Sequence, residues 1–149
     1  MAYEKRFMPI DLQPDVAVGV KLPLVSKSGQ LFDLSYSTEE QAISNIKNLL
    51  FTSKGERVMQ PQFGTKLPET LFEPNDDVLK ERISLEISDA IEFWLPYISI
   101  TKLNIETVIA VGESKEEHGV TISLQVAING QESEIPITFL VTADGAQEI

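Results

Sequence analysis

Residues 55–75 read GERVMQPQFGTKLPETLFEPN and form the segment around which the rest of the chain is organised. It contains two glycines and three prolines among apolar residues. Glycine permits turns that other residues resist, and proline fixes φ and removes a backbone donor, so this stretch cannot form one regular element. Its apolar content is too high for a solvated linker. We expect a partly buried connector of fixed shape that holds Arg57 and Glu73 in defined positions, with an ordinary packed loop as the alternative.

A first helix is predicted before the connector. Ser37 and Glu40 fit a capping box, in which each side chain accepts a hydrogen bond from the backbone amide of the other residue. Apolar residues then recur at helical spacing and form one face. We expect this helix to run from Thr38 to about Ser53 and to be ended by Gly55.

A second helix is predicted after the connector. Asn75 can cap its start, and Pro96 ends it. Its apolar stripe consists of Leu79, Ile83, Ile87, Ala90, Ile91, Trp94 and Leu95. Phe93 and Trp94 at its end are interpreted as core residues, with a platform for a ligand as the alternative.

The residue period changes to two in the C-terminal part, which predicts strands near residues 98–111, 120–128 and 135–141. Asn129 and Gly130 form the preferred two-residue hairpin turn, and residues 113–119 supply the other loop. Pro136 cannot donate to a ladder, so the last strand is expected at an outer edge, where another chain could pair with it.

These elements predict a single α+β domain over residues 1–149, with two main helices around an irregular connector packed on a three-stranded antiparallel sheet. The helical part covers residues 38–96 and the sheet residues 98–142. Residues 1–20 are expected to form an extended arm. Short apolar runs at 22–25 and 31–36 favour a small hairpin or two extended pieces.

Composition excludes several classes of function. The net charge is −11, and the residues after Ile83 contribute about −9 of it, with 2 basic and 11 acidic side chains. Such a surface repels phosphates and anionic lipids, so neither nucleic acid nor membrane is an expected partner. The acidic part is read as a device for solubility or as a contact surface for a basic partner strand. Since no apolar run approaches the length of a membrane helix and the start is not signal-like, we expect synthesis in the cytoplasm. With no cysteine, a disulfide framework, thiol catalysis and a thiolate metal site are excluded.

Catalytic chemistry finds little support in the sequence. The single histidine, His118, is expected in a charged loop without convergent partners, so no metal site is predicted. Glu56, Glu69 and Glu73 lie in the connector, but their spacing singles out no general acid and nucleophile. No glycine pattern for a nucleotide and no nucleophile motif is present. We therefore predict no catalytic residue, no cofactor and no small-molecule substrate.

The order of the motifs carries a resemblance. A helix, then G-E-R, then P-x-F-G, then L-F-E-P resembles the small baseplate wedge family of contractile-tailed bacteriophages, which includes a component of type VI secretion baseplates. The resemblance covers residues 38–141 and is densest from Gly55 to Pro74. Family members usually follow the Glu-Pro pair with arginine, whereas this chain has Asn75.

The resemblance implies a structural protein of the virion tail baseplate, assembled in the host cytoplasm, that clamps the wedge core and initiates the sheath. Arg57, Glu73, Pro74 and Asn75 are then expected to dock on the larger wedge subunits, although a salt bridge between Arg57 and Glu73 within the chain is equally compatible with the sequence. The tail sheath protein is expected to add a strand along Ile135, Ile137, Phe139 and Val141. The alternatives are a lysozyme-like glycosidase, after an old label of the family, and a type VI secretion component.

Overall fold

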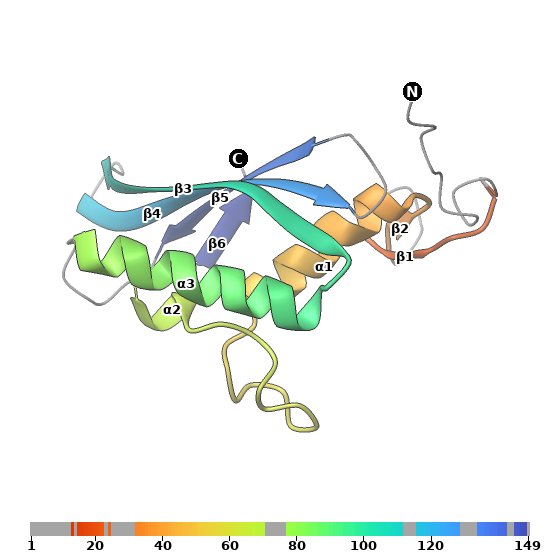
Figure 1. Cartoon of the computed structure of the whole chain (residues 1–149), viewed down its shortest axis with the longest axis horizontal. Helices are drawn as coiled ribbons and strands as arrows, with labels where there is room; N and C mark the ends of the chain where they lie inside the picture. Colours follow the sequence, from red (N-terminus) through yellow and green to blue (C-terminus); the bar gives the residue numbers. More distant parts are fainter. Residues whose placement is uncertain are drawn as a thin grey trace.

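The computed structural model describes residues 13, 15–22, 24, 32–70, 77–111, 116–128, 134–142 and 145–148. Its long helices, α1 (Thr38–Phe51) and α3 (Asp77–Trp94), lie on one face of an antiparallel sheet (Figure 1). The strands of this sheet are β3 (Ile98–Val111), β4 (Glu116–Ile128), β5 (Glu134–Thr142) and β6 (Gly145–Glu148), paired in that order. The predicted α+β class is confirmed. No helix among the described residues is long and apolar enough to cross a bilayer.

Two smaller features accompany these layers. Strands β1 (Gly19–Val20) and β2 (Leu34–Ser35) form an antiparallel hairpin, so a hairpin exists where apolar runs suggest one, but its first strand precedes the predicted run at 22–25. Most of the predicted N-terminal arm, residues 1–12, lies outside the described residues. A short helix, α2 (Leu67–Thr70), interrupts the connector.

The start of α1 is capped as the predicted reciprocal box requires, with one further contact. The Glu40 amide donates to Ser37 Oγ at 3.3 Å. The Glu40 carboxylate accepts from the amide of Tyr36 at 3.2 Å, and hydrogen bonds from the backbones of Tyr36 and Ser37 both contribute to lowering its pKa. Ser37 is extended, with φ −125° and ψ 153°, which brings the preceding amide within reach of the carboxylate. The Glu40 amide, one of the donors that the helix leaves without a partner in its first turn, is therefore satisfied by Ser37.

The end of α1 also differs from the prediction. The helix stops at Phe51 because Thr52 is already extended, with φ −88° and ψ 124°, and its hydroxyl donates back to the carbonyl of Asn48 at 2.6 Å. Gly55 lies four positions beyond the last helical residue. It therefore serves the following loop, where its φ is 93°, and does not cap the helix.

Helix α3 confirms the predicted stripe in most positions. Leu79, Ile83, Ile87, Ala90, Ile91 and Leu95 are buried. Trp94 is partly buried and packs against this core. Phe93, in contrast, is 75 % exposed, so its assignment to the core is wrong. One helical position rotates a side chain by about 100°, which carries Phe93 off the stripe.

The core lies between the helices and the sheet. Alternate residues of β4 and β5 are buried, and Phe139 from β5 meets Phe51 from α1 edge to face, with ring centroids 5.1 Å apart. A register shift between Ile100 and Lys102 of β3 is a bulge, which keeps Ile98 and Ile100 on the core side together with Leu103 and Ile105. Alternation therefore identifies the core face of the sheet, except where the bulge resets it.

The outer part of the sheet corrects three predictions. A fourth strand, β6, pairs with residues 139–142 of β5, so β5 is an edge strand only over residues 134–138 among the described residues. Strand β4 begins at Glu116, which places His118 opposite Ile109 in the ladder and not in a loop. Ala127 pairs with Glu134, whereas a two-residue turn at Asn129-Gly130 would pair it with Glu132. The turn residues themselves lie outside the described part of the chain.

An ion pair ties the β1-β2 hairpin to α1. Lys21 Nζ lies 2.8 Å from Glu40 Oε1, and the hydrogen bond from Lys21 is the main cause that lowers the pKa of Glu40. The same hydrogen bond is the main cause that raises the pKa of Lys21. A lowered carboxyl pKa stabilises the fold above the unfolded pKa, and this contribution is lost as pH falls through the folded pKa. The raised pKa of Lys21 contributes stability that is fully present below about pH 10.5, the ordinary pKa of lysine, and that is lost as pH rises through the raised pKa.

We expect Glu40→Gln to lower the free energy of unfolding by about 0.5 kcal/mol at pH 7, a small value because the half-exposed pair is screened by solvent. Urea unfolding at pH 7 and at pH 3 measures it, and the difference from the wild type should shrink at the lower pH. A double-mutant cycle with Lys21→Gln isolates the pair. A deficit as large at pH 3 as at pH 7 would contradict the assignment to this ion pair.

Candidate interaction surfaces

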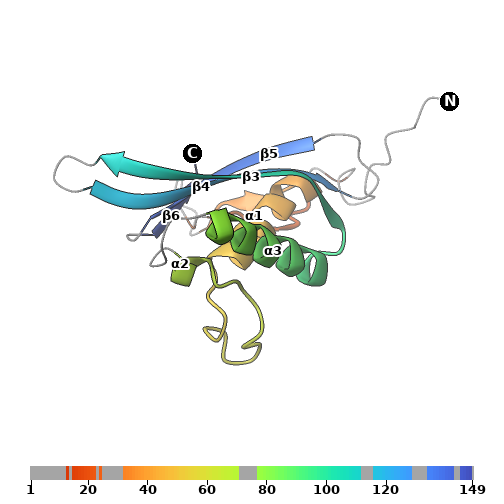
Figure 2. The same cartoon turned by 60° about the vertical axis from the view of Figure 1, so that its left-hand side comes forward.

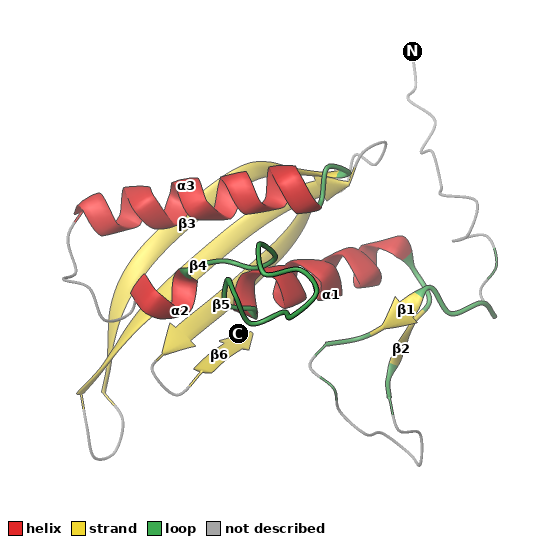
Figure 3. Ribbon diagram, turned by 90° about the horizontal axis from the view of Figure 1, so that it is seen from below, coloured by secondary structure: helices red, strands yellow, loops and turns green. Residues whose placement is uncertain are grey.

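Residues 52–66, here called the connector loop, leave α1 and project away from the sheet (Figures 2 and 3). The two ends of the loop are tied together: the Thr65 amide donates to the Thr52 carbonyl at 2.9 Å, and the Lys54 amide donates to the Thr65 carbonyl at 3.2 Å. Thr65 is fully buried, and its hydroxyl donates to the Leu50 carbonyl at 2.8 Å. Further out, the Gly55 amide donates to the Pro61 carbonyl at 2.8 Å. Over residues 55–70, the part of the predicted connector that the structure describes, the segment is irregular and its backbone is held by internal hydrogen bonds.

Gly64 lies where the two ends of the connector loop, near Thr52 and Thr65, come together. Its φ of 110° is one that side-chain-bearing residues rarely adopt, and a Cβ built there would lie 2.2 Å from the Thr52 carbonyl oxygen. Gly55 also has a positive φ, but a Cβ built there meets no atom within 4 Å. The two glycines therefore have different roles: one allows a turn, and the other allows two backbone segments to touch.

Arg57 is positioned by one contact inside the connector loop and one with α1. Its guanidinium carbon lies 3.8 Å from the centroid of the Phe63 ring, and its NH2 group donates to Asn48 Oδ1 at 3.3 Å. The Phe63 ring in turn meets Trp94 edge to face at 5.2 Å. Glu73, Pro74 and Asn75, the other predicted docking residues, lie outside the described residues. Arg57 therefore links the loop to α1 and, through Phe63, to α3.

The loop tip carries exposed apolar side chains that the sequence does not predict to be exposed. Phe63 and Leu67 are buried, as expected of a partly buried connector. Val58 and Met59 are 93 % and 92 % exposed. Because a side chain at the tip of a projecting loop has no neighbours to pack against, apolar character alone cannot distinguish these two residues from buried ones.

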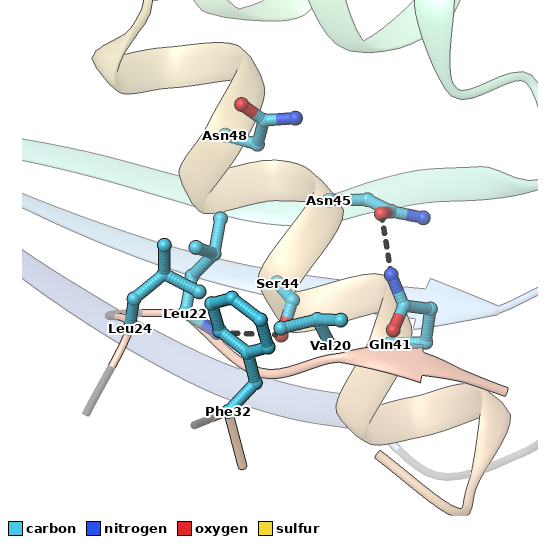
Figure 4. Close-up of a pocket in the computed structure, with 8 residues that line it drawn as sticks. All are labelled: Val20, Leu22, Leu24, Phe32, Gln41, Ser44, Asn45 and Asn48. Atoms are coloured by element: carbon cyan, nitrogen blue, oxygen red, sulfur yellow. Dashed lines mark hydrogen bonds between the residues drawn. The ribbon is translucent and has the colours of Figure 1, made fainter. Parts of the chain in front are cut away.

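The groove between the β1-β2 hairpin and α1 has a volume of about 390 Å³ (Figure 4). Its apolar side consists of Val20, Leu22, Leu24 and Phe32, and its polar side of Gln41, Ser44, Asn45 and Asn48 from α1. The polar row is already engaged inside the chain. Gln41 accepts from Ser35 Oγ and donates to Asn45, and Asn45 donates to Tyr97 Oη at 2.8 Å. Helical spacing in the sequence could have identified this row, whose contacts fasten the hairpin and the start of β3 to α1.

The outer edge of β5 offers backbone and not apolar side chains. Ile137, Phe139 and Val141 are buried against the helices, and Ile135 packs against the same core. A strand that paired with this edge would therefore contact main-chain groups of residues 134–138. Pro136 lies opposite Gln125 in the ladder, and a proline is tolerated there when its nitrogen faces outward.

Carboxylates of the connector show no catalytic arrangement among the described residues. Glu56 is exposed, and its Oε2 accepts from the Ser53 amide at 3.0 Å, which closes the first turn of the loop. Glu69 is exposed on α2. No group of three or more histidine, aspartate or glutamate side chains that could hold a metal ion occurs in the described part of the chain.

Comparison with known proteins identifies the fold and the family. A protein from Geobacter sulfurreducens described as a tail lysozyme is 23 % identical, with a TM-score of 0.59 over 71 % of this chain and 91 % of that one. A chain of the baseplate of the anti-feeding prophage is 18 % identical, with a TM-score of 0.60 over 76 % of this chain and 86 % of that one. At these identities the likeness concerns the fold.

A search of curated protein sequences gave no match. The model of the family described as baseplate wedge protein gp25 matches residues 37–133, which include α1, the connector loop, α3 and strands β3 and β4. Members of this family are structural components of baseplates. The chain belongs to the baseplate wedge protein gp25 family.

Proposed function

We propose that this protein is a wedge component of a contractile tail baseplate that docks on larger wedge subunits and initiates the sheath, and that it has no enzymatic activity. The observation that carries the proposal is the family match, which spans the two helices and the loop between them. The particle is taken to be a phage tail, assembled in the host cytoplasm. A type VI secretion baseplate is the alternative particle for the same structural role.

The first docking surface is the connector. Hydrogen bonds between the two ends of the connector loop hold its backbone, so little conformational entropy is lost when a partner binds. Arg57 acts there by holding Phe63 and Asn48. Glu73, Pro74 and Asn75 are proposed to contact the wedge subunits directly, with Glu73 accepting charge-assisted hydrogen bonds.

The second docking surface is the edge of β5 at residues 134–138. An edge strand is a template on which a further strand can add, and repeated main-chain hydrogen bonds suit a joint that must survive contraction. We propose that an extended arm of the sheath protein pairs there. Strand β6 shortens this edge compared with the whole run from Ile135 to Val141.

The absence of enzymatic activity is supported by the placement of the described carboxylates. Asp89 and Glu92 line one cleft, but they are three residues apart on α3. Side chains at that spacing share a helix face, whereas a glycosidase needs two carboxyl groups on opposite sides of the substrate. Glu56 is engaged in closing the loop.

We expect Glu73→Ala to weaken binding to the wedge subunits by about tenfold or more, because a charge-assisted contact at an interface contributes more than an exposed ion pair. A tagged chain is purified from producing cells, and the recovered wedge subunits are then titrated against it. Glu69→Ala is the matched control, since it removes an exposed carboxylate from the same connector. Recovery of no baseplate subunit by the folded wild type would refute the proposed function, and equal affinity of both variants would refute the role of Glu73.

A further inference from the structure

The cleft between the connector loop and the end of α3 has features that the proposed function does not use. It has a volume of about 540 Å³. It is lined by Lys54, Gln62 and Gly64 from the loop and by Asp89, Ala90, Glu92, Phe93 and Trp94 from α3. We call it the aromatic cleft.

Phe93 gives the cleft an exposed aromatic wall. Phe93 is 75 % exposed although Ile91 and Leu95, two positions away on either side, are buried. The ring meets Trp94 edge to face at 5.1 Å, and an edge-to-face contact leaves at least one face of the Phe93 ring uncovered. Aromatic side chains are enriched at protein interfaces because they bury a large area at a small entropic cost.

The walls of the cleft are fixed before any partner binds. Trp94 is held by Phe63, and Phe63 is held by Arg57. An ion pair between Lys54 and Glu86 joins the loop to α3. A wall built in this way needs little rearrangement on binding.

The charge of the cleft is negative. The carboxylates of Asp89 and Glu92 are exposed at its lining. Lys54, the cation that lines the cleft, is paired with Glu86, and Arg57 behind it is occupied by Phe63 and Asn48. An uncovered ring beside two exposed carboxylates is complementary to a cation that can stack and donate several hydrogen bonds.

The geometry points to an arginine of a partner subunit as the occupant of the aromatic cleft, with its guanidinium stacked on Phe93 and donating to Asp89 and Glu92. Arginine fits better than lysine because its planar group stacks on rings and reaches two acceptors at once. Arg57 over Phe63 shows the same stacking inside the chain. The inference rests on the proposed function, since the partner is taken to be a wedge subunit.

Affinity for the wedge subunits recovered with the wild type tests the inference. Phe93→Ala and the pair Asp89→Asn with Glu92→Gln should each weaken binding by about tenfold, a change of about 1.4 kcal/mol. Glu81→Gln, an exposed carboxylate of α3 outside the cleft lining, is the matched control and should leave the affinity unchanged. The neutralised pair should also reduce the dependence of affinity on salt. Unchanged thermal unfolding midpoints verify that the variants are folded.

A photo-crosslinking phenylalanine analogue at position 93 identifies the contact. Crosslinked partner peptides that contain arginine support the inference, and peptides without arginine overturn it. Full affinity in both cleft variants, together with loss in Glu73→Ala, overturns the cleft while the proposed function stands. Failure of the folded wild type to bind any wedge subunit overturns both.

Discussion

Gly64→Ala should lower the free energy of unfolding by roughly 3 kcal/mol, the largest stability effect that we expect outside the core. A methyl group at this position would lie 2.2 Å from the Thr52 carbonyl oxygen and 2.9 Å from its carbonyl carbon. Both are backbone atoms, so the strain cannot be relieved by a side-chain rotation. The positive φ of 110° adds a conformational cost to this contact.

Gly55→Ala is the matched control for Gly64→Ala. It has a similar φ of 93° but open space around the added methyl group, so only the conformational cost of about 1 kcal/mol remains. Trp94 is the single tryptophan of the chain and contacts Phe63 from the loop, so its fluorescence during urea unfolding reports on this region. Equal losses in the two variants would show that close approach of the backbone at Gly64 contributes nothing.

Thr138→Pro should abolish sheath initiation while the isolated protein stays folded, the largest functional effect that we expect. Residues of alternate parity in an antiparallel strand direct their N–H groups to opposite sides. Pro136 has no N–H and lies within the ladder, so its nitrogen is expected to face away from β4. Thr138 lies two residues further along, so its N–H is expected to point in the same outward direction. The substitution then removes an outward donor from residues 134–138, which pair with no further strand among the described residues, without removing a bond to β4.

Thr138→Ala is the control, because it removes the same side chain and keeps the N–H group. Sheath length and number are measured by electron microscopy of particles assembled with each variant. Particles with normal sheaths on a folded Thr138→Pro protein would exclude strand addition at this edge. Defects of equal size in both variants would assign the effect to the side chain.

Local chemistry in the sequence predicts the main elements well. The apolar stripe of α3 and the alternation in β4 and β5 identify buried residues, because helices and strands of this length bury one side against a common core. The glycines and prolines of the connector predict an irregular segment of fixed shape. Over the described residues the segment is irregular, and hydrogen bonds of Thr65 with Thr52 and Lys54 join the two ends of the connector loop. The resemblance to baseplate wedge proteins agrees with the family match over residues 37–133.

The candidate site is predicted less completely. Arg57 is identified from its place in the connector, but its contacts with Phe63 and Asn48 depend on where the loop returns after Pro61. The exposure of Phe93 depends on its rotation about α3 relative to the loop. The aromatic cleft joins residues from two segments that are about 25 positions or more apart, so no local pattern reveals it.

Periodicity, caps and turn residues act over a few positions, so they predict the class of fold, the two helices, the irregular connector and the three long strands. The pairing of β6 with residues 139–142 of β5 and the contact of Gly64 with the backbone of Thr52 are seen only in the folded structure. The same holds for the contact of Arg57 with Phe63, for the contact of Phe63 with Trp94, and for the exposure of Phe93. These contacts join distant residues, and their free energy depends on the packing of the whole chain.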